Sequence, residues 1–162
     1  MITNAIQRRN NMLARLLEPK TEASYTFLRI IIGLLFAFHG MQGLTGYLIP
    51  PEYAPHFGTQ GWYGSVIELV TGLGIAIGLL TPWMAFLASG TMAVAYVQFH
   101  WKFAFGEKFL PAANQGEPAL MYSVLFLYMA CRGAGKWSFD RMLAGEGARG
   151  KVKPARQQEV HA

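Results

Sequence analysis

The sequence is poor in charge. Asp, Glu, Lys and Arg make up 14% of its 162 residues, whereas hydrophobic residues make up 52%. A soluble domain averages roughly 25% charged residues, so this shortage indicates a large surface that does not face water. The net charge is +5, but the basic residues gather near the two ends, which suits a membrane surface and not nucleic acid. We expect a single domain, a lipid bilayer as its partner, and no nucleic-acid partner.

The sequence also lacks several short motifs that mark disulfide, nucleotide-binding or metal sites. Cys131 is the only cysteine, which excludes an internal disulfide and a CxxC dithiol pair. No glycine-rich phosphate loop follows a strand pattern, and no HxxxH or ExxH spacing offers a tight metal motif. Residues 3–11 are polar where a cleavable signal peptide would have its apolar core. We therefore expect no soluble nucleotide site, and we favour an organic ligand over a metal.

Four apolar stretches dominate the chain instead. They cover residues 25–44, 62–80, 83–103 and 118–134. A membrane-spanning helix needs ~20 residues, with ~17 as the lower limit, so the fourth stretch is the shortest that qualifies. Residues 30–38 and 69–80 lack the polar stripe of a soluble bundle helix. We predict an all-α integral membrane protein, with a four-helix transmembrane domain over residues 25–142.

The segment boundaries fit this prediction. Tryptophan side chains prefer the headgroup layer, and three lie at segment ends: Trp62, Trp83 and Trp101. Thr81 and Pro82 form a tight break, so the second and third stretches are predicted to form a helical hairpin. Gly74 and Gly78 form a small-xxx-small pair that allows close helix approach. Arg132 ends the fourth stretch, and we expect it to reach toward the membrane surface.

The two tails are basic. Residues 1–24 place Ile6, Leu13, Leu16 and Leu17 near one helical face beside arginines, which predicts an N-terminal interfacial helix or, alternatively, a frayed tail. Residues 143–162 are rich in Gly, Lys and Arg, so we expect a disordered tail. The first two connections between the spans contain no Lys or Arg. The positive-inside rule therefore places both termini in the cytoplasm of a multi-pass protein.

The most informative feature is a set of ionisable residues at similar depth. At ~1.5 Å rise per residue, His39 lies roughly 8 Å and Glu68 roughly 9 Å inside the outer ends of their helices. His100 lies nearer the outer end of the third helix, and Glu117 begins the fourth. A charged residue in hydrocarbon costs ~2.5 kcal/mol or more on insertion scales, so Glu68 should face the bundle interior. Hydrogen-bonding residues lie close to these in sequence: Gln42, Tyr96 and Asn114.

Such a cluster suits more than one ligand. His and Glu side chains could hydrogen-bond the carbonyls of a quinone and carry its protons, with Glu68 and His39 in that role. Iron, zinc or another transition metal is the less favoured alternative. Each residue also has a structural interpretation: His100 and Glu117 as interface residues, His39 as a hydrogen-bonded packing residue. Arg29 lies in the other half of the first helix, and we expect it to reach the surface or to serve a structural role, or otherwise to pair with a carboxylate or an anionic headgroup.

These residues resemble the DoxX family of small bacterial membrane proteins. The resemblance rests on short motifs in order, over about residues 24–142: Leu28-Arg29-Ile30, Phe38-His39-Gly40, Glu68-Leu69, Met92 to Tyr96 followed by His100, Asn114-Gln115-Gly116-Glu117, and Ser138-Phe139-Asp140. The family often has Lys in an HGxxK stretch where this chain has Gly43. It often reads NGGE where this chain has Gln115.

The resemblance implies a four-helix protein of the bacterial plasma membrane. It also implies an association with redox chemistry, because members resemble a subunit of thiosulfate:quinone oxidoreductase and a partner in a membrane redox complex. Carried onto this chain, it makes His39, Glu68, His100 and Glu117 the site candidates.

Three hypotheses of function follow from the sequence. The first is a quinone-linked redox component that works with a redox partner protein. The second is a non-enzymatic anchor or assembly subunit that uses its basic tails. The third is a small solute or metal transporter, which would need a homo-oligomer because four helices are few. Whether the protein is an enzyme stays open at this stage.

Overall fold

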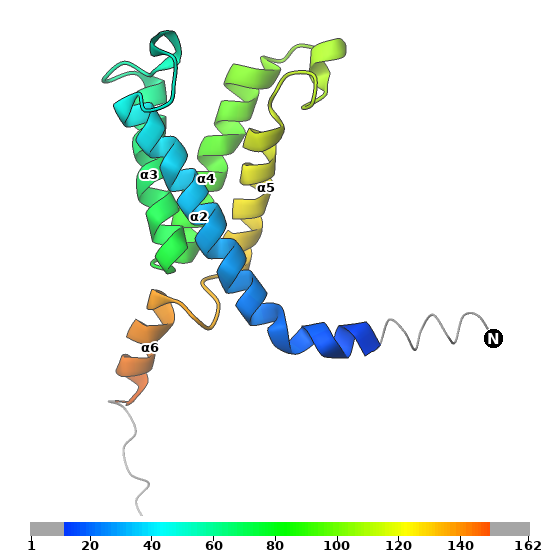
Figure 1. Cartoon of the computed structure of the whole chain (residues 1–162), viewed down its shortest axis with the longest axis vertical. Coiled ribbons are helices and arrows are strands. Elements are labelled where there is room, and N and C mark those ends of the chain that lie inside the picture. The colour runs from blue at the N-terminus through cyan, green and yellow to red at the C-terminus, as the bar shows by residue number, and fades with distance from the viewer. Residues whose placement is uncertain (1–11, 150–162) are drawn as a thin grey trace, which may run out of the picture.

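The computed structural model describes residues 12–149, and all regular structure in that part of the chain is helical. Figure 1 shows the long helices running up and down beside one another. They are α2 (Thr21–Thr45), α3 (Gln60–Ile77), α4 (Thr81–Ala95) and α5 (Glu117–Arg132). The all-α prediction is thus confirmed, and the tight turn before Thr81 makes α3 and α4 a helical hairpin.

Shorter elements flank the long helices. A π-helix, η3 (Tyr96–Trp101), continues α4, and α6 (Phe139–Arg149) follows α5. The 3₁₀ turns are η1 (Glu18–Lys20), η2 (Pro51–Tyr53) and η4 (Glu107–Phe109). We call the end that carries α6 the lower end and the opposite end the upper end, as they stand in Figure 1. By length and composition, one helical stretch in the described residues, Met12–Thr45, could cross a membrane.

Helices α2 and α3 approach closely along a seam of glycines. A Cβ on Gly33 would lie 2.6 Å from the backbone nitrogen of Ala76, and one on Gly72 would lie 2.5 Å from the backbone nitrogen of Ala37. Backbone atoms cannot turn aside, so each position requires glycine. The small-xxx-small prediction named a different pair, Gly74 and Gly78, which meet side chains and not the backbone of a neighbouring helix, and Gly78 ends α3 at φ +77°.

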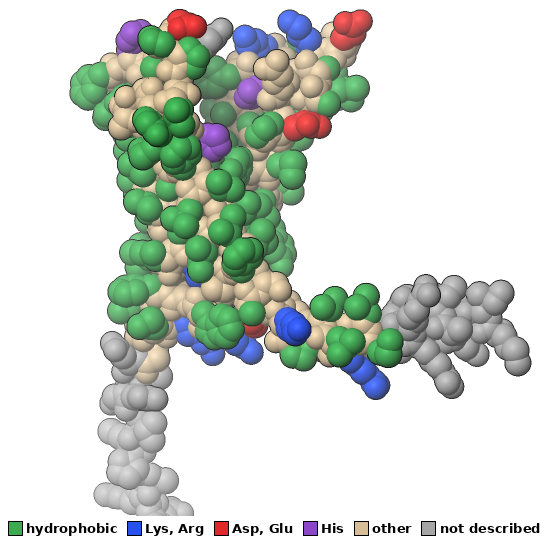
Figure 2. All heavy atoms as spheres, in the orientation of Figure 1, with side chains coloured by type: hydrophobic (Ala, Val, Ile, Leu, Met, Phe, Trp, Pro, Cys, Tyr) green, Lys and Arg blue, Asp and Glu red, His purple; other side chains and the backbone are tan. Residues whose placement is uncertain are grey.

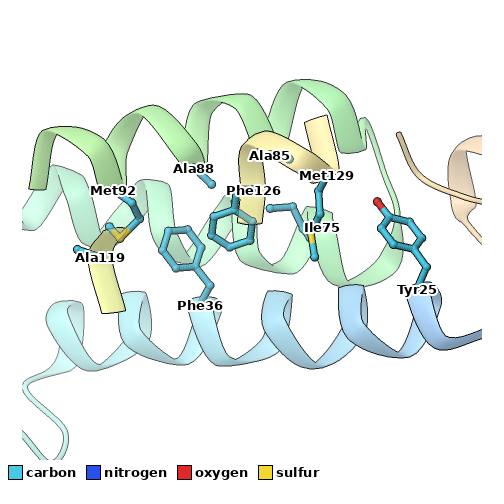
Figure 3. Close-up of a cluster of buried hydrophobic side chains, with 9 residues drawn as sticks. All are labelled: Tyr25, Phe36, Ile75, Ala85, Ala88, Met92, Ala119, Phe126 and Met129. Atoms are coloured by element: carbon cyan, nitrogen blue, oxygen red, sulfur yellow. The ribbon is translucent and has the colours of Figure 1, made fainter. Parts of the chain in front are cut away.

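The apolar core fills the lower half and the middle of the bundle. Phe36, Ile75, Phe126 and Met129 come from three helices and are 0–1% exposed. Figure 3 shows them meeting between the ribbons, with small alanines of α4 above them. Because α4 presents these small side chains, the bulky residues of its neighbours interdigitate against it.

Arg29 ties the lower end together. Its side chain is 1% exposed, and its Nη1 donates to the backbone oxygens of Ile75 (2.6 Å) and Ala76 (3.1 Å) at the end of α3. Its Nη2 donates to the oxygen of Trp137 at 2.9 Å. The last carbonyls of a helix lack intrahelical partners, so Arg29 of α2 caps α3. These contacts confirm the structural role that was one expectation for Arg29, while within the described residues it neither reaches the surface nor pairs with an anion.

Asp140 of α6 caps the next helix. Its carboxylate accepts hydrogen bonds from the backbone nitrogens of Leu80 (2.7 Å) and Thr81 (3.0 Å), where α4 begins. The backbone nitrogen of Asp140 donates to the oxygen of Gly78 at 2.9 Å. A carboxylate satisfies the free N–H groups of a helix start and favours its positive dipole end. The segment after α5 thereby closes the α3–α4 turn from below.

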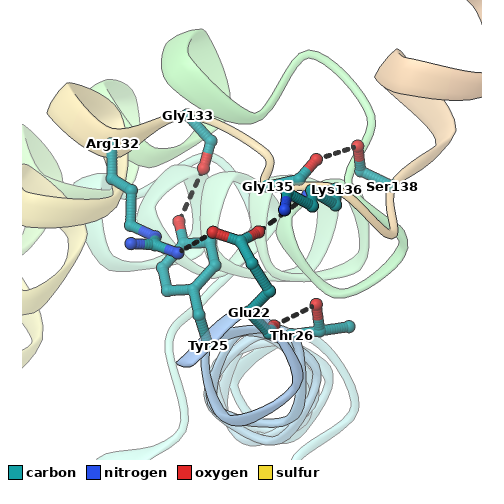
Figure 4. A network of polar contacts seen from close by, with 8 residues as sticks. All are labelled: Glu22, Tyr25, Thr26, Arg132, Gly133, Gly135, Lys136 and Ser138. Atoms are coloured by element: carbon teal, nitrogen blue, oxygen red, sulfur yellow. Dashed lines mark hydrogen bonds and ion pairs between the residues drawn. The ribbon is translucent and has the colours of Figure 1, made fainter. Parts of the chain in front are cut away.

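A third set of contacts joins α2 to α5. Glu22 pairs with Arg132 at 2.7 Å and accepts a hydrogen bond from the nitrogen of Lys136. The hydroxyl of Tyr25 donates to the oxygen of Gly133 at 2.6 Å, and the Arg132 guanidinium lies 3.9 Å from the Tyr25 ring centroid (Figure 4). Arg132, which we expect to reach toward the membrane surface, also contacts a carboxylate and an aromatic ring. We call these three sets of contacts the lower clasp.

Two tail predictions meet the structure in part. Residues 12–17 are helical and bend into α2 through η1, as Figure 1 shows, while residues 1–11 lie outside the described part. At the other end α6 runs from Phe139 to Arg149, so the first part of the predicted disordered tail, residues 143–149, lies within this helix. The rest of that predicted tail, residues 150–162, lies outside the described residues.

Candidate functional site: a polar cavity at the upper end

The upper end of the bundle is open. Figure 1 shows the connection after α2 and the connection after η3 standing apart there, and Figure 2 shows a notch between two upper lobes. A cavity of about 320 Å³ lies between α2 and α5 at this end. Its polar lining includes His39, Gln42, Glu68 and His100. Four of the seven sequence-predicted site residues therefore line one cavity, and they come from α2, α3 and the π-helix.

Aromatic and aliphatic side chains complete its wall. Phe36 and Tyr122 lie with ring centroids 5.4 Å apart, and the His39 ring stands edge-on to Tyr122 at 6.2 Å. Met92 and Ala119 line the cavity from α4 and α5. The result is a mostly apolar chamber with a few polar groups, which is the composition of small-molecule sites in general.

Glu68 of α3 is half-buried and faces this cavity. Among the described residues it makes no hydrogen bond and no ion pair, in contrast to Glu22 at the lower end. It lies one turn after Ser65, whose hydroxyl donates to the oxygen of Gly61 and so is already engaged. A carboxyl group in apolar surroundings without a partner is costly, which makes Glu68 a candidate to bind a ligand.

His100 is placed by a local departure from α-helical geometry. The nitrogen of Lys102 donates to the oxygen of Val97 at 2.8 Å, which is the i to i+5 bond of a π-helix. His100 Nδ1 lies 3.3 Å from the backbone oxygen of Asn114, so the other ring nitrogen is available to the cavity. Short π-helical segments occur frequently at functional sites, and this one turns His100 into the chamber.

The other predicted residues do not line this cavity. The ring of Tyr96 packs against Gly116, where a Cβ would lie 2.7 Å from the ring. Asn114 holds its own loop, because its Nδ2 donates to the oxygen of Lys108 and its Oδ1 accepts from the nitrogen of Gly116. Glu117 is exposed at the first turn of α5. The structure thus gives Tyr96 and Asn114 supporting positions and keeps Glu117 away from Glu68 and its histidines.

Two departures from the family motif also have a structural reason. Gly43 lies where helices α2 and α3 meet, and a Cβ there would overlap the side chain of Ser65. Gln115 stands where the family loop often has glycine, and its φ is +60°, the left-handed region that glycine favours. The backbone of the loop is therefore the one that the glycine-containing motif suggests.

Glu68 also lines a second cavity, which the sequence patterns did not predict. It is a groove of about 460 Å³ between α3 and α4, and Glu68 lines both cavities. Glycines form part of its wall: Gly61, Gly64 and Gly90. A signal was present, because Gly61 and Gly64 precede Glu68 by seven and four residues and so share its helix face.

The chemistry of the cavity fits an organic ligand better than a metal. Histidine N–H groups and the Gln42 amide can donate to a carbonyl, and Glu68 can accept from a hydroxyl. Among residues 12–149, no group of three or more His, Cys, Asp or Glu side chains comes close enough to hold a metal ion. The arrangement can therefore bind a flat apolar molecule whose polar edge faces Glu68 and its histidines.

Comparisons with known proteins agree with the sequence motifs. The family model described as DoxX matches residues 24–101. An uncharacterized protein of Haemophilus influenzae is 37% identical over 121 residues, which cover 70% of this chain and 86% of that protein. The inner membrane protein YqjF of Escherichia coli is 31% identical over 118 residues, which cover 71% of this chain and 88% of that protein. No solved structure matches the chain significantly.

Proposed function

Because the chain belongs to the DoxX family and is similar to an inner membrane protein, it is a bacterial inner-membrane protein, and we propose that it binds a membrane quinone at its upper cavity. The observation that carries the proposal is the side chain of Glu68. It lines the polar cavity together with His39 and His100, and it makes no hydrogen bond or ion pair among the described residues. The protein would serve as the quinone-binding component of a redox system whose electrons come from a partner protein.

All four long helices cross the bilayer in this proposal. Each exposes large apolar side chains that a water-soluble protein would bury, for example Phe27 (68%), Val70 (52%), Phe86 (63%) and Met121 (71%). Figure 2 shows hydrophobic side chains across the middle of the visible face and charged ones toward the two ends. Helix α4 gains length from η3, and α5 is short but lies between the same two levels in Figure 1.

The lower end faces the cytoplasm in this proposal. Arg15 and Lys20 lie before α2, and Arg132 and Lys136 lie at the end of α5, so basic residues from both ends of the chain gather there. The α3–α4 turn at the same end has no Lys or Arg of its own. Positive charge near short connections marks the cytoplasmic side. The polar cavity then lies toward the periplasmic leaflet.

Each polar group has a role that matches quinone chemistry. Reduction of a quinone to a quinol takes up two electrons and two protons. His39 and His100 are placed to donate hydrogen bonds to a carbonyl oxygen, and Glu68 to exchange a proton with it. The aromatic wall of Phe36 and Tyr122 offers faces for a flat ring. This chain would position the ring and handle protons, while the partner supplies the electrons.

The structure offers less to the two other hypotheses. A transporter needs an inner exit, and below Glu68 the bundle is filled by Phe36, Phe126 and Met129 and closed by Arg29. A pure anchor would have no use for an unpaired carboxyl group facing a chamber. Transport would require a second conformation in which the lower clasp opens.

The test is direct binding of a quinone to the purified protein in lipid nanodiscs. A benzoquinol with a decyl tail, the reduced form of the ligand, should bind the wild type, and Glu68→Gln should weaken binding roughly 10- to 100-fold, because the Glu68 carboxylate would accept a charge-assisted hydrogen bond from the quinol hydroxyl, which is worth about 1.5–3 kcal/mol. Glu107→Gln is the matched control, since Glu107 is exposed on the upper connection and lines neither cavity. Absence of binding to the wild type, or equal binding to all three proteins, would refute the proposal.

A further inference from the structure

The groove between α3 and α4 reaches Glu68 from the side opposite the polar cavity. The two cavities share five lining residues, so these side chains separate them: Pro55, Ser65, Glu68, Met92 and Ala95. We propose that this groove receives the apolar tail of a membrane-borne quinone and is the lateral path by which the molecule reaches Glu68 from the bilayer. The inference rests on the proposed function and adds the class of ligand, a long-tailed quinone, and its route.

The lining of the groove suits a hydrocarbon chain. Ile67, Met92, Val94 and Phe99 give it apolar walls, and Glu68 is the only carboxylate on them. The rim residues Val94 and Phe99 are 47% and 54% exposed. In a protein that spans the bilayer, side chains exposed at this depth face lipid tails. The groove therefore connects the hydrocarbon of the membrane with the carboxyl group that we assign to the head group.

Two of the three groove glycines, Gly64 and Gly90, are not explained by helix packing, whereas a Cβ on the third, Gly61, would lie 3.3 Å from Pro55. A Cβ added to Gly64 or to Gly90 would meet no atom within 4 Å, whereas one added to Gly33 or to Gly72 would meet backbone within 3 Å. In the α2–α3 seam glycine makes room for another helix. Beside Gly64 and Gly90 the space that glycine leaves is empty of protein. An occupant from outside the described chain accounts for that space, and continuity with the Glu68 cavity identifies it as part of the same ligand.

The groove is bridged at its upper edge. Gln60 at the start of α3 donates a side-chain hydrogen bond to Gln98 of η3 at 2.5 Å. Gln60 itself lines the groove. A molecule in the groove would therefore leave sideways toward the bilayer, and a small molecule from the aqueous side would reach Glu68 through the open notch between α2 and α5. The two routes predict different behaviour for ligands with and without a tail.

The experiment fills the groove and compares two probes. Gly90→Leu and Gly64→Leu each place a bulky side chain in the empty space without a backbone clash. The probes are a decyl-tailed benzoquinone and the same ring without a tail, each titrated against purified protein in nanodiscs. We expect both variants to weaken the tailed probe at least tenfold and to leave the tailless probe within twofold of wild type. Ala93→Leu is the matched control, because Ala93 is exposed on α4 and lines neither cavity.

The outcomes separate this inference from the function on which it rests. If the wild type binds both probes and the leucine variants bind them equally well, the groove does not hold the tail, and the quinone proposal stands. If the variants weaken both probes alike, the groove belongs to the head-group site and the inference is also wrong. If the wild type binds neither probe, the proposed function fails and the inference falls with it. The two glycine positions are tested independently, so that one poorly folding variant does not decide the result.

Discussion

The two ends of the bundle treat their ionisable residues in opposite ways. At the lower end Glu22, Arg29, Arg132 and Asp140 all have partners, and those partners join α2, α3, α4 and α5. At the upper end Glu68 and His39 face a cavity and make no hydrogen bond within the described residues. The same residue types thus hold the helices together at the lower end and leave ionisable side chains available to a ligand at the upper end.

This difference separates stability from function in space. A polar group with its hydrogen bonds satisfied holds helices in place, and removing it leaves its partners unsatisfied. A polar group without partners contributes little to folding and is available to bind a ligand. Substitutions at the lower end should therefore affect the folded state first, and substitutions around the upper cavity should affect binding first.

The largest loss is expected on removal of Arg29. Arg29→Leu removes the guanidinium donor from the carbonyls of Ile75, Ala76 and Trp137, and each buried carbonyl left without a donor costs about 1–3 kcal/mol. Arg29→Lys keeps the charge but loses the forked guanidinium that reaches both α3 and Trp137. Its stability should therefore lie between that of the wild type and that of Arg29→Leu. Thermal unfolding in detergent and the yield of monodisperse protein measure the effect. Arg141→Leu, at an exposed position of α6, should behave as wild type.

A smaller loss is expected in the helix seam. The Cβ of Gly72→Ala would lie 2.5 Å from the nitrogen of Ala37, so α2 and α3 must separate, at about 1–3 kcal/mol. Gly64→Ala on the same helix meets no atom and gains helix propensity, so it should raise stability by up to about 1 kcal/mol. The unfolding midpoints of the two variants should therefore shift in opposite directions. Equal shifts would mean that the seam is not closely packed.

The sequence predicted well the features that depend on the order of residues along a single helix. Hydrophobicity predicted the four helices because each apolar stretch is continuous, and depth arithmetic placed His39, Glu68 and His100 at the level of one cavity. It could not give the rotation of each helix, because helices that are apolar all round have no polar stripe to orient them. Glu117 has the right depth but the wrong direction, and it is exposed.

Contacts between distant segments were also beyond the sequence. Arg29 binds backbone carbonyls, which every residue has. The residue types in α3 and at position 137 therefore do not predict the contact. The groove beside Glu68 depends on the divergence of α3 from α4 at the upper end, which no local pattern encodes. The π-helix that turns His100 has the same origin, since it departs from the period on which the helix prediction was based.

The smallest expected effect gives the most direct comparison of the two ends, since the same substitution is made at each. Glu22→Gln removes the charge that pairs with Arg132, and a partly exposed ion pair is worth up to about 1 kcal/mol, so stability should fall by that amount or less. Glu68→Gln removes an ionisable group that has no partner in the described chain, so stability should stay the same or rise by up to about 1 kcal/mol. Urea or thermal unfolding of both proteins in the same detergent gives the sign. If Glu68→Gln proves the more destabilising of the two, then Glu68 already has a structural partner, and the upper end is held together by the same means as the lower.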